Sequence, residues 1–235
     1  MKWLLIIVLC LGALGFAAFR TLFGGQTVIW HQRLTVIVDT PNSEVQGSAV
    51  TEVRLSDDRG ALQLPESAGV HARFTGEAVV VEVVPGRYLF VLLDGGTGWQ
   101  SDAAHWAYAA FDLAPSNSTD FRDSMAKLKA QPLNNPVPLP PIAFPLLVTF
   151  ADITRPETVQ KVDPQNLAAT FGPGVSLKGV TLEVTREPVT ARKVEGVLGW
   201  LNDPKFRTNP IWASLSELTQ DAITNLETPV QGLIP

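Results

Sequence analysis

The chain has 235 residues, of which 46% are hydrophobic and 17% charged, and its net charge is −5. This length suits one domain with small appendages, and the composition excludes a disordered acidic chain, a collagen and a coiled coil. A single cysteine excludes a disulfide framework and a cysteine-rich zinc module. The sequence has no basic block, which argues against a nucleic-acid-binding protein.

An apolar run near the amino terminus is the strongest signal in the sequence. Residues 3–19 are uncharged and lie between Lys2 and Arg20. Seventeen helical residues span about 25 Å, which is the short limit for crossing a bilayer. We therefore predict a signal anchor or transmembrane helix at residues 1–23. A cleaved secretory signal is the alternative.

The position of this run predicts where the rest of the chain lies. A short amino-terminal tail followed by a long domain favours export of that domain. We expect a single-pass inner-membrane protein with its carboxy-terminal domain in the periplasm, or a secreted protein if the signal is cleaved. The predicted partners are the membrane and other envelope proteins, and nucleic acid is not among them.

Residues 28–98 are typical of a β-rich, sandwich-like subdomain. Apolar residues alternate with polar ones in residues 28–38 and 49–55, which is the pattern of half-buried strands. Residues 77–84 place Val79, Val81 and Val83 on one face, and residues 87–93 form a further, strongly apolar strand. Pro85-Gly86 between them predicts a hairpin.

Three short motifs in this region carry a resemblance to a known fold. They are Val45-Gln-Gly-Ser-Ala-Val50, Gly76-Glu-Ala-Val and Pro85-Gly-Arg-Tyr-Leu. On these motifs, residues 34–94 resemble the prealbumin-like sandwich of carboxypeptidase regulatory and Cna-B-type modules. The resemblance implies a structural or binding module without catalytic residues. The whole chain also resembles uncharacterised single-pass envelope proteins of Gram-negative bacteria, which implies a bacterial source.

The remainder of the chain predicts helices, a linker and a second, smaller unit. Six prolines between Pro132 and Pro145 favour an extended linker that packs on the domain surface. Pro156 and Asp163-Pro164 are typical helix starts, and residues 180–185 alternate as a half-exposed strand. The predicted fold class is thus α+β, with a transmembrane helix, a β-rich half and a smaller α/β half. The predicted units after the span are 28–98 (β-rich), 99–131 (helical), 132–145 (linker), 146–202 (α/β) and 203–235 (a helix and tail).

A glycine-rich pentapeptide, Asp94-Gly-Gly-Thr-Gly98, is the first candidate site. It follows an apolar strand and resembles the phosphate loop of actin-like and sugar-kinase ATPases, in which glycine amides approach phosphates. That family also needs a second acidic loop and an adenosine motif, and the sequence shows neither. The alternative is a glycine-rich turn that ends a hairpin.

Aromatic residues near this loop suggest a binding surface, since tryptophan and tyrosine anchor interfaces and stack on sugars. The alternative is that they fill the core. The predicted ligand-binding residues are Asp94, Gly95, Gly96, Gly98, Trp99, Trp106 and Tyr108.

A second candidate is the pair Asp102 and His105, which would face each other on a helix as an aspartate-oriented base. The sequence has no G-x-S-x-G elbow to supply a nucleophile, and its three histidines have no metal-ligand spacing. We therefore predict no catalytic residue, metal or cofactor. The expected role is a structural, assembly or binding factor of the envelope. The alternatives are an exported hydrolase using His105 and Asp102, or a cytoplasmic-facing phosphate binder at residues 94–98.

Overall fold

The computed structural model describes residues 26–57, 69–94, 101–115, 121–203 and 217–228. Within these ranges, no helix is both long enough and apolar enough to cross a membrane. The membrane span predicted at residues 1–23 lies outside them.

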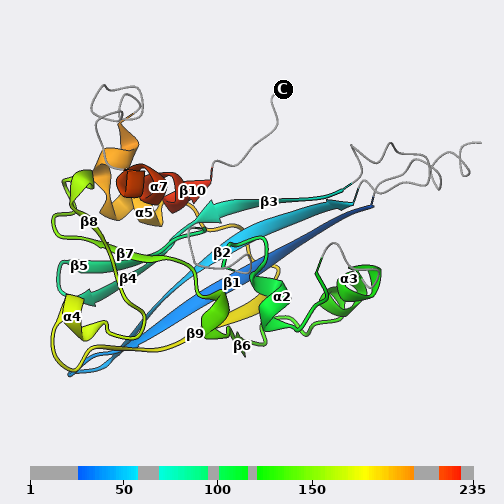
Figure 1. Ribbon diagram of the computed structural model, residues 1–235, viewed down its shortest axis with the longest axis horizontal. Helices are drawn as coiled ribbons and strands as arrows, with labels where there is room; N and C mark the ends of the chain where they lie inside the picture. The colour runs from blue at the N-terminus through cyan, green and yellow to red at the C-terminus, as the bar shows by residue number, and fades with distance from the viewer. Residues whose placement is uncertain (1–25, 58–68, 95–100, 116–120, 204–216, 229–235) are drawn as a thin grey trace, which may run out of the picture.

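A long antiparallel hairpin forms the centre of the larger sheet. Strands β1 (Gln26–Asp39) and β2 (Glu44–Asp57) each have 14 residues, and they pair from Gln26 opposite Asp57 to Asp39 opposite Glu44. The sheet has the order β10-β3-β2-β1-β9-β6 (Figure 1). The remaining strands are β3 (Val70–Glu77), β6 (Val137–Pro138), β9 (Ser176–Thr185) and β10 (Glu227–Thr228).

A smaller sheet lies against the inner face of the larger one, in the order β4-β5-β7-β8. Its strands are β4 (Val79–Val84), β5 (Arg87–Val91), β7 (Leu147–Phe150) and β8 (Val159–Lys161), and all of them pair antiparallel. The two sheets are in close contact at Gly47 of β2. A Cβ atom added there would lie 2.2 Å from the carbonyl oxygen of Val80, so only glycine allows this crossing.

The helices are short and pack on parts of each sheet that the other sheet does not cover (Figure 1). Helices α2 and α3 pack on the larger sheet beside the smaller one, and α5 and α7 cover the far side of the smaller sheet. The α-helices are α2 (Trp106–Ala110), α3 (Phe121–Lys129), α4 (Ala168–Phe171), α5 (Lys193–Val197) and α7 (Glu217–Leu226). The 3₁₀ turns are η1 (Pro141–Ala143), η2 (Pro156–Thr158) and η3 (Gly199–Asn202).

Two apolar clusters hold these layers together. The first lies between the sheets and is built from alternate residues of β1, β2, β4, β5 and β9, with side chains of α2 and α3. The second lies between the smaller sheet and the helices α5 and α7. Strand β5 belongs to both, because Leu89 and Val91 point into the first cluster while Phe90 points into the second. A strand buried on both faces is apolar at consecutive positions, as Leu89-Phe-Val-Leu-Leu93 is.

The predicted fold class is wrong. The described chain is built mainly from two antiparallel sheets, and the region predicted as a separate α/β half supplies strands to both of them. Strand β7 pairs with β5, and β9 lies beside β1 in the larger sheet. The reason is that Val180 and Leu182 repeat the alternation of Val36 and Leu34, so β9 extends the same buried face.

A local signal also misled the prediction at one place. Pro156 begins only a 3₁₀ turn, and the chain then enters β8 because buried Val159 pairs with Phe150 of β7. The proline-rich residues 132–145 contribute β6, which pairs with β9 at the edge of the larger sheet. Proline has no N–H to donate, and a sheet edge tolerates it because no further strand needs that donor.

Candidate functional site

Of the predicted ligand-binding residues, the structure describes only Asp94, Trp106 and Tyr108. Gly95, Gly96, Gly98 and Trp99 lie outside the described residues, and Asp94 is exposed. Trp106 and Tyr108 of α2 are each only 1% exposed and belong to the core between the sheets. The indole Nε1 of Trp106 donates a hydrogen bond to the carbonyl oxygen of Ser101 at 2.9 Å, so its polar atom is used within the fold.

The predicted Asp102–His105 pair is present. His105 Nδ1 lies 2.8 Å from the Asp102 carboxylate. The same carboxylate accepts a hydrogen bond from the backbone N–H of Ala104 at 2.8 Å. Asp102 and His105 lie in the turn that leads into α2, and not on a helix as predicted. This is the local pattern of an aspartate that stabilises a turn at a helix start. A hydrolase at this pair remains a prediction.

Metal binding receives no support from the part of the chain that the structure describes. Its His, Cys, Asp and Glu side chains form no group of three or more that could hold a metal ion.

A groove of about 680 Å³ crosses the outer face of the larger sheet. Most of its lining comes from the outward residues of β1, β2 and β9, and the rest comes from the proline-rich segment, from Val80 of β4 and from Lys193. The lining residues are Arg33, Thr35, Ile37, Gln46, Gly47, Ser48, Val80, Pro136, Pro138, Thr181, Glu183 and Lys193.

Strand alternation places the β1 residues of this lining on the outer face. Leu34 and Val36 of β1 are buried against the smaller sheet, so Arg33, Thr35 and Ile37 must point the opposite way. The pairing register sets Arg33 opposite Glu183 of β9.

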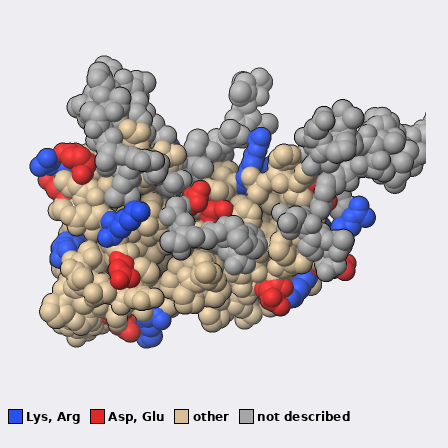
Figure 2. All heavy atoms as spheres, viewed as in Figure 1, with Lys and Arg blue, Asp and Glu red and all other residues tan. Residues whose placement is uncertain are grey.

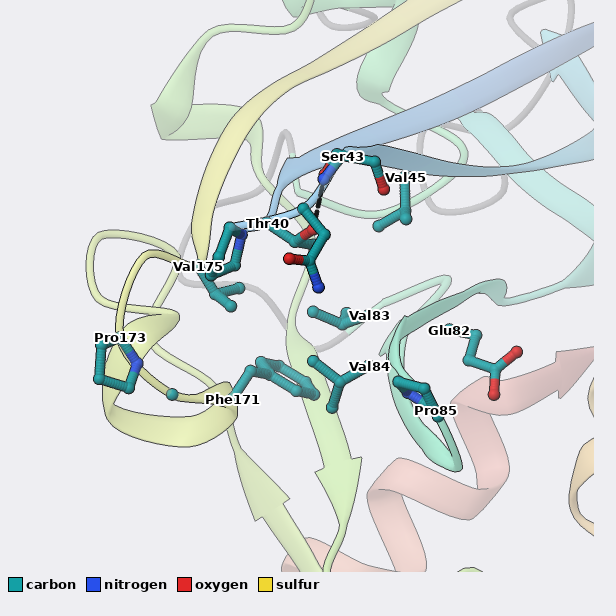
Figure 3. A pocket seen from close by; sticks show the side chains of 13 residues that line it. Thr40, Ser43, Val45, Glu82, Val83, Val84, Pro85, Phe171, Pro173 and Val175 are labelled. Atoms are coloured by element: carbon teal, nitrogen blue, oxygen red, sulfur yellow. Dashed lines mark hydrogen bonds between the residues drawn. The ribbon is translucent and has the colours of Figure 1, made fainter.

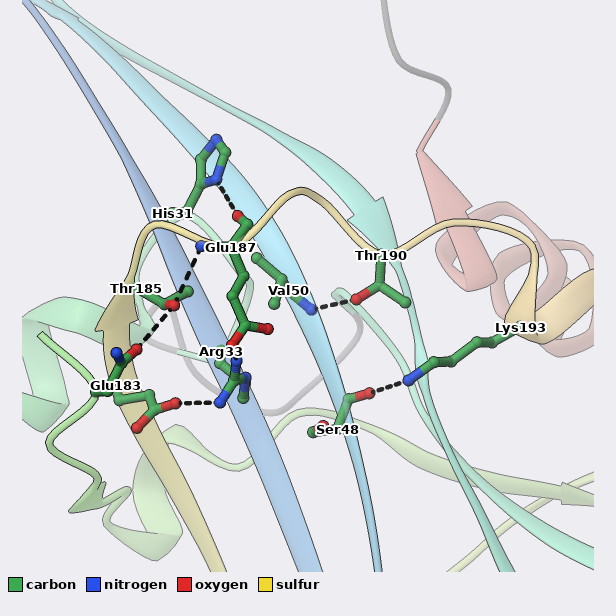
Figure 4. Close-up of polar contacts among 10 residues, drawn as sticks. His31, Arg33, Ser48, Val50, Glu183, Thr185, Glu187, Thr190 and Lys193 are labelled. Carbon is green, nitrogen blue, oxygen red and sulfur yellow. Dashed lines mark hydrogen bonds and ion pairs between the residues drawn. The ribbon is translucent and has the colours of Figure 1, made fainter.

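A segment between β9 and α5, residues 186–192, crosses the outer face beside this groove; we call it the crossing segment (Figure 4). His31 Nδ1 donates to the carbonyl oxygen of Glu187 at 2.6 Å. Farther along, Thr190 Oγ1 accepts a hydrogen bond from the backbone N–H of Val50 at 2.8 Å, and the Thr190 N–H donates to the Val50 carbonyl at 3.0 Å. The segment is thus fixed to β1 at one end and to β2 at the other.

Charges at the groove are arranged around Arg33. Its guanidinium donates to Glu183 Oε1 at 2.7 Å and forms an ion pair with Glu187 of the crossing segment (Figure 4). The hydrogen bond to Glu187 and the charge of Glu183 raise the pKa of Arg33, although its partial burial acts in the opposite direction. Because two carboxylates contact one guanidinium, these three groups together carry a net negative charge.

Lys193 marks the other end of the groove. Its ammonium donates to the carbonyl oxygen of Ser48 at 3.1 Å (Figure 4). The backbone N–H groups of Lys193 and Val194, at the start of α5, donate to the Glu77 carboxylate at 3.0–3.2 Å. Glu77 is only 2% exposed, and this burial raises its pKa, while the N–H donors act against the rise.

A smaller cavity of about 440 Å³ lies near the tip of the β1–β2 hairpin (Figure 3). It is lined by the turn at residues 40–43, by the β4–β5 turn and by Phe171 at the end of α4. The Thr40 hydroxyl donates to the carbonyl oxygen of Ser43 at 2.6 Å, which fixes the turn. Backbone and apolar groups dominate this lining, so the larger groove is the richer in side-chain donors and acceptors.

No protein-family model, curated protein sequence or solved structure matches the chain. The resemblance of residues 34–94 to a prealbumin-like sandwich therefore stays a prediction. The interpretation of function depends on the geometry of the chain itself.

The groove is lined by hydroxyl, amide and charged side chains, with apolar contact from Ile37, Val80 and two prolines. On the face shown in Figure 2, acidic and basic side chains are interspersed rather than gathered by sign. Sequence reasoning missed the groove because its residues come from β1, β2, β6 and β9. One signal was available, since every second residue of β1 from His31 to Thr35 is polar.

Proposed function

We propose that this chain is a membrane-attached envelope protein whose exported domain binds a partner protein in the groove on the outer face of the larger sheet. Its role is that of a structural, assembly or binding factor. The apolar residues 3–19 support attachment to the membrane. The groove is the single observation that carries the binding role.

The shape and lining of the groove favour an extended segment of a protein as the ligand. Hydroxyls of Thr35, Ser48 and Thr181 and the amide of Gln46 lie along it, and such groups pair with the N–H and C=O groups of an extended backbone. Ile37 and Pro138 supply apolar contact for alternate side chains of that segment. Confinement to the membrane surface raises the effective concentration of the domain toward membrane partners.

The experiment has two arms. A carboxy-terminal reporter that is active only outside the cytoplasm tests export, and alkali extraction of the membranes tests attachment. A photoreactive amino acid placed at Thr35 or Gln46 in the intact cell then tests the groove, and one at exposed Gln160 of β8 is the matched control. We expect an active reporter, an alkali-resistant protein and a discrete crosslinked species from both groove positions but not from Gln160. A silent reporter, or equal crosslinking from all three positions, would overturn the proposal.

A further inference from the structure

Three neighbouring strands place Ile29, Arg54 and Arg73 in one row across the outer face of the larger sheet. Ile29 of β1 pairs with Arg54 of β2, and Arg54 pairs with Arg73 of β3. Residues that pair directly across strands project from the same face. Ile29 is 47% exposed, the Arg54 side chain is 52% exposed, and Arg73 is exposed as well.

The row combines two like charges with an apolar side chain. Because both guanidiniums project from one face of the sheet, a single anionic surface can contact them together. His71 of β3 lies two residues from Arg73 toward the end of the sheet. Glu52 of β2 lies two residues from Arg54 toward the centre of the sheet. The Glu52 carboxylate is 3.4 Å from His31 Nε2 and 3.9 Å from the Arg54 guanidinium, so it is shared between two basic groups.

The covalent chain keeps this row close to the apolar run. Ile29 lies ten positions after Phe19, the last apolar residue of the run. Because an extended chain spans at most about 3.4 Å per residue, the row lies within about 34 Å of the end of the run. The strand ends near the row, which are the start of β1, the end of β2 and the start of β3, lie together at one end of the sheet (Figure 1).

The geometry points to this row, Ile29-Arg54-Arg73, as a surface that docks on an anionic phospholipid membrane. The inference rests on the membrane attachment proposed above. The two guanidiniums bind lipid phosphates through paired N–H donors, and Ile29 enters the boundary between headgroups and acyl chains. Docking holds the larger sheet in a fixed orientation on the membrane, which leaves the tip of the long hairpin and the smaller sheet directed away from it.

The test uses the full chain in phospholipid vesicles. Cys10 is the only cysteine, so Cys10→Ser combined with Ile29→Cys places a single environment-sensitive dye on the row. The probe is quenched by a lipid that carries a quencher at its headgroup. Vesicles of phosphatidylcholine alone are compared with vesicles that also contain phosphatidylglycerol. A dye at Gln160→Cys, on the exposed side of β8 far from the row, is the matched probe (Figure 1).

We expect strong quenching at position 29 only in vesicles with phosphatidylglycerol, and its loss in high salt. Each arginine near an anionic surface contributes roughly fivefold, so Arg54→Gln with Arg73→Gln lowers the ratio of docked to undocked protein about 30-fold. The control Arg155→Gln with Lys161→Gln removes two basic residues near β8 and leaves quenching unchanged. Circular dichroism confirms that both double variants remain folded.

The outcomes separate this inference from the proposed function. Protein that is lost from the vesicles by alkali extraction contradicts the membrane attachment itself. Protein that stays in the vesicles but shows no quenching at position 29, or equal quenching in both lipids, overturns the docking surface alone. Equal loss from the Arg155/Lys161 control would also overturn it, because the effect would then come from net charge rather than from this row.

Discussion

The two faces of strand β1 show how one sequence segment serves two purposes. Its inward residues Leu34, Val36 and Val38 are at most 1% exposed and contribute to the core between the sheets. Its outward residues Arg33 and Thr35 alternate with them and line the groove. Both faces depend on the same backbone register, which β2 and β9 fix from either side.

This difference indicates where stability resides and where change is tolerated. Burial of the inward face supplies the main favourable energy of folding, because apolar area leaves water there. The outward face carries hydrogen bonds and ion pairs that are partly solvated, and each of these contributes little on its own. Substitutions on the two faces should therefore differ in their effect on stability.

The largest expected effect comes from Leu34, which is 1% exposed in the core. Leu34→Ala removes buried methyl groups and leaves a cavity, so we expect a loss of about 2–5 kcal/mol in the free energy of unfolding. The adjacent Thr35→Ala faces outward and should change it by less than about 0.5 kcal/mol. Urea denaturation followed by circular dichroism measures both, and equal losses would contradict the division between the faces.

We expect the next largest loss of stability at the contact between the two sheets. Gly47→Ala places a methyl group against the backbone of Val80, which a flexible side chain cannot relieve, so we expect a loss of about 1–3 kcal/mol. Gly179→Ala in β9 is the matched control, because a Cβ there has no atom within 4 Å. Thermal unfolding should show a lower melting temperature for the Gly47 variant only. If Gly47→Ala were neutral, the close packing of β4 on β2 would be wrong.

On the outward face, we expect the ion pairs of Arg33 to make the largest contribution to the free energy of unfolding. Arg33→Gln leaves Glu183, which is 9% exposed, without its cation, and we expect a loss of about 1–2 kcal/mol. The exposed pair of Arg155 and Glu157 offers a control, since Arg155→Gln should cost less than about 0.5 kcal/mol. High salt should reduce the difference in the free energy of unfolding between the wild type and the Arg33 variant. A difference that stays the same in high salt would show that Arg33 stabilises the fold through packing rather than through charge.

The smallest effect is a pH dependence at Glu77. Its pKa in the folded state is raised from the ordinary value of 4.5 by burial, so the folded protein binds the proton more tightly than the unfolded chain. Stability contributed by this group is present below pH 4.5 and is lost as the pH rises through the folded pKa. Glu77→Gln cannot ionise, so relative to this variant the wild type should lose stability across that window. The free energy of unfolding of both proteins is measured from pH 4 to about 7. A difference between them that stays constant with pH would contradict the raised pKa of Glu77.

Periodicity alone located several strands. The alternation in residues 28–38 and 180–185 predicted strands that the structure contains as β1 and β9, and Pro85-Gly86 correctly marked the β4–β5 hairpin. Strand β3 was missed because residues such as His71, Ala72 and Arg73 are polar or small and lie exposed near the sheet edge. Pairing with β2 stabilises that segment, and such pairing is invisible to a local pattern.

The candidate sites were harder to predict than the strands. The aromatic residues Trp106 and Tyr108 were assigned to a ligand surface, but the structure uses them as core, as their apolar area favours. The groove was not predicted, because Arg33, Glu183 and Lys193 are separated by up to 160 positions in the chain. No spacing motif can report residues that only strand pairing brings together.

By itself, the sequence determined the alternation that makes β1 two-faced, the hairpin turn at Pro85-Gly86 and the hydrophobic run that suggests a membrane. These are local properties, set by side-chain period and backbone preference. Only the tertiary structure decided that β9 joins β1, that β7 joins β5, and that the groove forms where the crossing segment meets Arg33. Such choices depend on which distant strands can share one buried face, and that is settled by packing of the whole chain.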